Sequence, residues 1–310
     1  MIIIVYVPLR LYYEVHFLKD FFRPTRMGAR LRTALIVCLL LALFLWTSQT
    51  VFAHRRPAFK PDYPMQDLIP LLTQKVLGPD DYKVLFLQTG LAKPTVDHLL
   101  DRGDPGQAQL LDVQRQFFLP RATVCTPIFG PFVMEDHLPS PQNGATAWAP
   151  QMVDLEDGDV LITYSTHSFG WRHGHAGLVV DAAQGKSIEA AVIGSDAAVL
   201  STQHWRSYSS YLVLRLREIT PQLQQELVSW SLAHLDGAPY RLTSGFWGLK
   251  EPDDGDFGLQ CSYLVWYAFQ QFGYDVDSDG GRLVSVDDLA HSPLFDVVQL
   301  YGLDPRDWMA

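Results

Sequence analysis

Apolar residues recur at helical spacing in the segment that begins at Cys261. Positions 264, 265, 268, 269 and 272 are apolar, and this spacing is typical of an amphipathic helix. Gly273 follows, and glycine often ends a helix because it adopts the left-handed conformation without steric cost. The pattern predicts a helix that starts at Cys261 and ends before Gly273.

Upstream of this helix the pattern changes to short apolar or alternating runs, which predict β-strands. The predicted strands are 158–164, 175–180, 187–193 and 211–217. Thr220 and Pro221 then predict an N-cap and a first helical position, for a helix to about Leu235. Strands followed by segregated helices predict an α+β domain over residues 154–310.

Three further segments have distinct patterns. Residues 66–119 repeat apolar positions at helical spacing between glycines, which predicts a helical accessory region. Residues 120–153 carry several prolines and an Asn-Gly pair, so we expect an irregular connector. Residues 285–310 are expected to form a short tail, with Ser285 as a candidate N-cap.

The first 53 residues have the composition of a targeting segment. Arginines precede an apolar run over residues 34–46, and Val51-Phe52-Ala53 could be read by a signal peptidase. The same stretch could instead be an uncleaved membrane anchor, because 33–53 could just span a bilayer. Both interpretations predict an exported protein, with possible membrane association through the N-terminus, and residues 54–65 as a linker.

Composition narrows the function classes. The chain has 310 residues and a formal net charge of −10, so there is no electrostatic reason to expect nucleic acid as a partner. Nothing in the sequence calls for a cofactor, and the oligomeric state is not predicted.

A cysteine at a helix start is a candidate nucleophile. Unpaired N–H groups and the positive end of the helix dipole favour thiolate over thiol at Cys261. His175 opens a predicted strand and would accept and return the proton. The pair predicts activated-thiol chemistry.

The third catalytic residue depends on a predicted hairpin. A five-residue loop from Asp181 to Gly185 would pair Val180 with Lys186, and therefore Gly177 with Glu189. Glu189 would then lie diagonal to His175 on the same face, where its carboxylate could orient the imidazole. A shift of one residue would turn Glu189 away. His204 is the substitute for this role.

Five short motifs in order resemble one known family. They are 156–161, 174–180, 188–190, 237–240 and 261–265. Together they resemble the NlpC/P60 superfamily, and the order of histidine before cysteine is similar to its circularly permuted branch of YiiX-like, papain-related amidases. The resemblance covers roughly residues 154–295.

The resemblance implies a permuted papain-like domain preceded by the small helical region. It implies that Cys261 attacks an amide or ester carbonyl, that His175 moves the proton and that Glu189 is the third polar residue. It also implies that Tyr240, Ser262 and Tyr263 lie at the substrate site, although a tyrosine at 263 departs from the acidic residue often found there. The expected partner is a peptidoglycan peptide or another amide or acyl substrate, without metal or cofactor.

Alternatives to this interpretation remain open from the sequence. The same thiol could act on lipid or other acyl substrates, and a hydrophobic groove beside Cys261 would favour that alternative. Cys125 and Cys261 could instead form a disulfide in a non-catalytic wall-binding or structural protein. His173, His175 and Cys261 could bind zinc. Residues 275–281 match the start of a calcium loop but lack its final glutamate, so a polar turn is favoured.

Overall fold

The computed structural model describes residues 26–53, 58–119, 121–129, 133–139, 148–168, 171–241, 250 and 258–309. Residues 1–25 of the expected targeting segment, 54–57 of the expected linker and the Asn-Gly pair at 143–144 lie outside these ranges.

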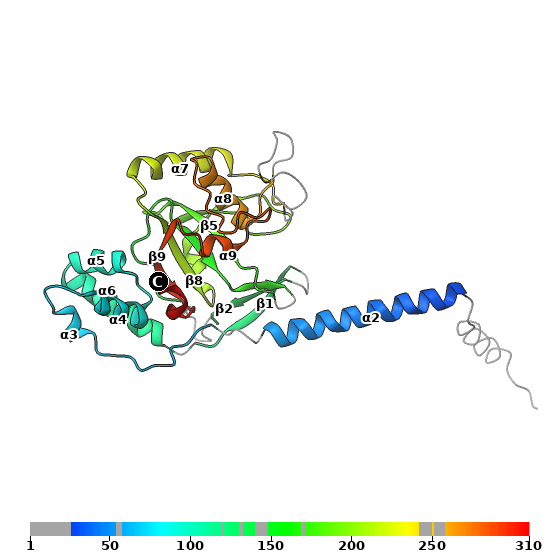
Figure 1. The fold of residues 1–310 in the computed structure, drawn as a ribbon, viewed down its shortest axis with the longest axis horizontal. Coiled ribbons are helices and arrows are strands. Elements are labelled where there is room, and N and C mark those ends of the chain that lie inside the picture. Colours follow the sequence, from blue (N-terminus) through cyan, green and yellow to red (C-terminus); the bar gives the residue numbers. More distant parts are fainter. Residues whose placement is uncertain are drawn as a thin grey trace, which may run out of the picture.

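A six-stranded antiparallel sheet forms the centre of the fold (Figure 1). Its order is β7 (Ala198–Ser201), β6 (Lys186–Glu189), β5 (His175–Asp181), β3 (Val160–Thr163), β8 (Tyr211–Leu216) and β9 (Phe295–Tyr301). The apolar residues of β3 and β5 are buried, as expected for central strands covered on both faces. Together with the helices, the sheet confirms the predicted α+β class.

Strand β9 lies where the sequence predicts only a tail. It pairs with β8 along its whole length. Its polar Gln299 is buried and uses its side chain to bond the backbone of Gln151 and Val153. These hydrogen bonds satisfy the buried amide of Gln299, but they come from a segment about 150 residues away. The local sequence therefore could not reveal that a polar residue would be tolerated in a buried strand.

A second, three-stranded sheet corrects the expectation of an irregular connector over 120–153. Strands β1 (Val124–Phe129) and β2 (Val133–His137) form a hairpin, and β4 (Thr166–Ser168) pairs with β2. Pro127 is tolerated because β1 is an edge strand with an irregular register at that point.

Two longer helices, α7 (Pro221–His234) and α8 (Cys261–Gln270), pack against β5 and each other. Figure 1 shows both on the same side of the larger sheet. Thr220 caps α7 by accepting from Leu223 N, and α8 ends before Gly273, which confirms both predicted helices. The shorter elements are η1 (Thr202–Ser207), α9 (Val286–Ala290) and η2 (Pro305–Trp308); Ser285 caps α9, as predicted.

Four helices precede the sheets: α3 (Ile69–Leu72), α4 (Pro79–Thr89), α5 (Lys93–Asp101) and α6 (Asp104–Phe118). Their apolar faces enclose a small core of their own. The turn between α4 and α5 joins them to the edge of β9, because Ala92 N donates to Val298 O at 3.0 Å and Leu300 N donates to Gly90 O at 2.8 Å. Gly90 is required there, since a Cβ would lie 2.1 Å from the carbonyl oxygen of Leu300.

The N-terminal apolar run is a single helix, α2 (Arg26–Ala53), that projects from the folded body (Figure 1). Its segment from Arg30 to Thr47 is long and apolar enough to cross a membrane and buries none of its length against the protein. A signal sequence and a membrane anchor both have these properties.

Candidate active site

Cys261 is the first residue of α8, and it lies against the start of β5. Burial alone would raise the pKa of the thiol. Hydrogen bonding and positive charge from His175, together with backbone hydrogen bonds from Ala176 and Ser262, outweigh burial and lower that pKa. The site therefore favours a thiolate at Cys261.

His175 is held between the sulfur of Cys261 and the carboxylate of Glu189. Its Nε2 lies 2.8 Å from Glu189 Oε2, so Nδ1 is the ring nitrogen left for the thiol. Its ring stacks on Trp205, with 5.2 Å between centroids and 13° between planes. Burial lowers the pKa of His175, but the bonds to Cys261 and Glu189 raise it above the usual range overall. A thiolate–imidazolium pair results.

Glu189 ends β6 and is fully buried, with donors on both carboxylate oxygens. Oε1 accepts from Ser187 Oγ at 2.5 Å and from Trp205 Nε1 at 2.9 Å. Oε2 faces His175 Nε2 and, at 3.2 Å, His204 Nε2. Burial raises the pKa of Glu189, but bonds to the two histidines outweigh it and lower the pKa to about 2. The carboxylate stays ionised and fixes the imidazole.

The hairpin that brings Glu189 to His175 differs from the predicted one at its turn. Lys186 pairs with Asp181 rather than Val180, because the ladder has an irregularity between Val179 and Asp181. Beyond it, Leu178 pairs with Ile188, the register that sets Gly177 opposite Glu189. A Cβ at Gly177 would lie 2.8 Å from Glu189 Cγ, so glycine is needed for the carboxylate to cross toward His175.

A cavity of about 780 Å³ opens beside the thiol. Most of the described residues that line it are apolar, and Cys261, His175 and Gln260 are also among the lining residues. The larger apolar side chains are Ile128, Val133, Trp171, Val192, Ile193, Leu283, Val284 and Val286. Polar groups of β2 and β4 form one wall, through Glu135, Thr166 and Ser168. An apolar pocket with a few polar groups is typical of ligand sites.

The three predicted substrate residues have different positions. Tyr240 lines the cavity, and burial and the negative charge of Cys261 raise its pKa. Ser262 also borders it, but its hydroxyl donates to Val284 O at 2.8 Å and so holds the 283–286 wall in place. Tyr263 is buried in the core and donates to Lys250 O at 2.5 Å. Helical geometry turns position 263 away from the face that carries Cys261, and Tyr263 is not among the described residues that line the cavity. Its role as a substrate residue stays a prediction.

Glu135 and Tyr208 also line the cavity, and neither belongs to a sequence motif that predicts a site residue. Burial raises the pKa of Glu135, but the hydrogen bond and charge of His137 outweigh it and lower the pKa overall. Burial, together with the charges of Glu135 and Glu189, raises the pKa of Tyr208. Glu135 lay in the segment expected to be irregular, so only recognition of the β1–β2 hairpin could have drawn attention to it.

The disulfide and the zinc site that the sequence left open do not match the geometry. Cys125 and Cys261 are both free thiols, which contradicts the disulfide. His173 Nε2 lies 3.0 Å from Ser168 Oγ rather than joining Cys261 in a metal site. In the calcium-like segment, Asp277, Asp279 and Asp288 come together, but Asp277 pairs with Lys250 and Asp288 caps α9.

Comparisons with known proteins give one similar structure. No protein-family model and no curated protein match the sequence. Among solved structures, the chain is similar to the crystal structure of the metalloprotein YiiX (DUF1105) from Escherichia coli O157:H7. The identity is 18%, the alignment covers 46% of this chain and 96% of the other, and the TM-score is 0.36.

The lowered pKa of Cys261 predicts its alkylation behaviour. We expect iodoacetamide to react with Cys261 at pH values below the ordinary thiol pKa of about 8.5. Replacing His175 with alanine removes the imidazolium but leaves the burial, so the reaction should shift to higher pH. In chelator-treated protein Cys125 is an internal control, because partial burial of its sulfur and the charge of Asp136 raise its pKa to about 11. Peptide mass spectrometry would give both rates, and a Cys261 profile no lower than that of Cys125 would contradict the thiolate.

Proposed function

We propose that this protein is a cysteine hydrolase that cleaves an amide or ester bond through an acyl-enzyme on Cys261. The observation that carries the proposal is the chain of contacts from Cys261 to His175 to Glu189. A nucleophile, a base and a residue that orients the base are the parts required for covalent acyl transfer.

In the proposed mechanism, the Cys261 thiolate attacks the substrate carbonyl carbon, and the carbonyl electron pair moves to oxygen. The backbone N–H of Cys261, at the start of α8, is the proposed donor to that oxyanion. Collapse breaks the bond to the leaving group, which takes the proton from His175. His175 then removes a proton from water as the water attacks the thioester carbon. The C–S bond breaks, the carboxylic acid product leaves, and the Cys261 thiolate and protonated His175 are restored.

We also propose that residues 154–310 form a permuted papain-like domain. Three features support it: the order of His175, Glu189 and Cys261 in the chain, the cysteine at the start of a helix, and the histidine at the start of a strand that packs on that helix. These match what the resemblance to the permuted NlpC/P60 branch implies.

For the substrate, the cavity favours an apolar acyl group. Its volume of about 780 Å³ and its apolar lining suit a hydrocarbon chain or a large apolar side chain. Burial of such a chain would contribute about 0.8 kcal/mol for each methylene. We therefore propose a lipid-like or other apolar ester, amide or thioester as the substrate, with a thiol acyltransferase as the related activity if another nucleophile replaces water.

A cell-wall peptide is the second candidate substrate. The polar wall of Glu135, Thr166 and Ser168 supports it, because these groups could bond peptide amides. The apolar α2 helix suits an exported or membrane-anchored enzyme for either substrate.

A substrate panel separates the two candidates. Detergent-solubilised full-length protein would be offered p-nitrophenyl esters and fatty-acyl amides of increasing chain length, and purified muropeptides. We expect hydrolysis with kcat/KM rising with chain length until the cavity is filled, by up to about fourfold for each methylene. Cleavage of muropeptides alone would favour the second candidate. Failure to cleave any of them, with Cys261 reactive toward iodoacetamide, would contradict the hydrolase proposal.

A further inference from the structure

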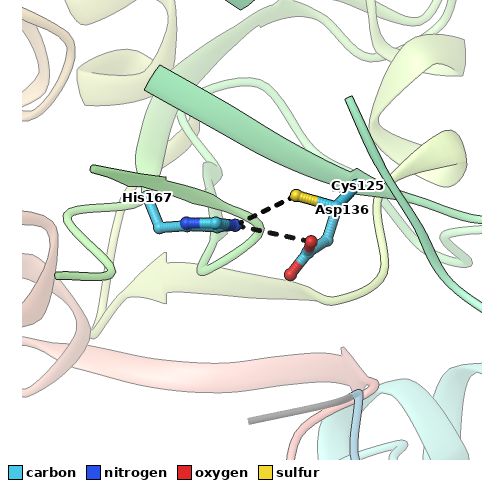
Figure 2. Close-up of side chains that lie close together, drawn as sticks. All are labelled: Cys125, Asp136 and His167. Carbon is cyan, nitrogen blue, oxygen red and sulfur yellow. Dashed lines mark hydrogen bonds and ion pairs between the residues drawn. The ribbon is translucent and has the colours of Figure 1, made fainter. Parts of the chain in front are cut away.

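A second cluster of chemically active side chains lies on the smaller sheet. Figure 2 shows Cys125, Asp136 and His167 pointing toward one another. Each comes from a different strand: Cys125 from β1, Asp136 from β2 and His167 from β4. His167 Nε2 lies 3.5 Å from Cys125 Sγ and 3.5 Å from Asp136 Oδ1.

This arrangement is not a second catalytic triad. In a triad the nucleophile and the carboxylate bind opposite nitrogens of the imidazole, as at His175. Here the same Nε2 faces both groups, as Figure 2 shows. The other nitrogen, Nδ1, is buried without a hydrogen-bond partner among the described residues. The ring therefore cannot pass a proton from Cys125 to Asp136 through its two nitrogens.

The two separations from His167 Nε2 agree with the edges of a tetrahedral metal site, and the ligand atoms of all three residues lie within 4.8 Å of one another. With Zn–S of about 2.3 Å and Zn–N or Zn–O of about 2.0–2.1 Å, tetrahedral angles give edges of about 3.6 Å for S to N and about 3.3 Å for N to O. The observed separations are both 3.5 Å. For a hydrogen bond from a ring N–H to a carboxylate, 3.5 Å is long.

We propose that Cys125, Asp136 and His167 bind one divalent transition-metal ion of the zinc type. A thiolate, an imidazole and a carboxylate are ligands that Zn²⁺ accepts together. Arg172 donates to the other oxygen of Asp136 at 2.7 Å and so directs Oδ1 toward the cluster. Cys125 is exposed, which leaves the fourth position open to water.

The ion would have a structural effect on the candidate active site. Adjacent residues of a strand point to opposite faces of a sheet. Asp136 and His167 therefore lie on the face opposite Glu135, Thr166 and Ser168, which line the cavity. A metal ion on the face that carries Asp136 and His167 would join β1, β2 and β4. It would thereby rigidify the cavity wall on the opposite face without touching Cys261.

Cobalt binding to the full-length protein in detergent tests the proposal. After treatment with a chelator, we expect the chain to take up one Co²⁺ per molecule, with the near-ultraviolet absorption of a thiolate–cobalt bond, and Zn²⁺ to displace it. Cys125→Ser should remove that absorption and weaken binding by about tenfold or more. Zn²⁺ should raise the melting temperature of the wild type and not of Cys125→Ser.

Two controls make the outcome specific. Cys261→Ser should keep the absorption, since that thiol lies outside the cluster. Cys125→Ser without metal should melt near the metal-free wild type, because residue 125 is exposed and serine is similar in size to cysteine. The absence of saturable uptake, or absorption that persists in Cys125→Ser and disappears in Cys261→Ser, would overturn the proposal. Neither result depends on whether the protein hydrolyses any substrate.

Discussion

Replacing Cys261 with alanine will lower kcat/KM by about 10⁴-fold or more for any amide or ester that the wild-type protein cleaves. The sulfur of Cys261 forms the acyl-enzyme in the proposed mechanism, and neither His175 nor Glu189 can replace it as the nucleophile. The comparison requires steady-state rates of wild type and variant on the best substrate from the panel, at equal concentrations of folded protein.

Cys38→Ala is the matched control for this substitution. It also removes a thiol, but Cys38 is exposed on α2, away from the cavity, so the rate should stay within about twofold. A second control is an acyl-enzyme trap: rapid acid quench and mass spectrometry should find the acyl group on Cys261 of the wild type only. Turnover retained in Cys261→Ala would mean that another nucleophile carries the reaction.

Replacing Glu189 with alanine will destabilise the fold by about 3–5 kcal/mol near neutral pH. The change leaves the buried His175 imidazolium without its carboxylate partner, so that only the Cys261 thiolate balances its charge. Losses of this size are typical of broken buried ion pairs. It also leaves Ser187 Oγ and Trp205 Nε1 without their acceptor. The free energy of unfolding from denaturant titration measures the effect.

The pH dependence of that difference follows from the pKa of Glu189. Because folding lowers it to about 2, the carboxylate contributes stability that is fully present above its ordinary pKa of about 4.3 and is lost as the pH falls through about 2. The difference in the free energy of unfolding between wild type and Glu189→Ala should therefore be largest near pH 7 and decrease toward pH 2. Glu226→Ala, at an exposed position on α7, should change stability by less than about 0.5 kcal/mol. A similar small loss for Glu189→Ala would contradict the buried pair.

The local elements of the candidate site could be predicted because their signals are short-range. Apolar spacing and Gly273 predict the helix of Cys261, and the run from His175 predicts its strand. The Gly177–Glu189 relation also depends on neighbouring residues, since a hairpin register is set by its own turn. Even there, the sequence-based turn was wrong by one residue, because nothing local indicates the irregularity at Val180.

By itself, the sequence determined the α+β class, the apolar N-terminal helix and the residues able to form an activated thiol site. Only the tertiary structure decided which of them meet. It placed Tyr263 in the core, added β9 at the sheet edge, and brought Cys125, Asp136 and His167 together from three strands. These outcomes depend on pairing between distant segments, whose free energy comes from burial and hydrogen bonds that no local pattern encodes.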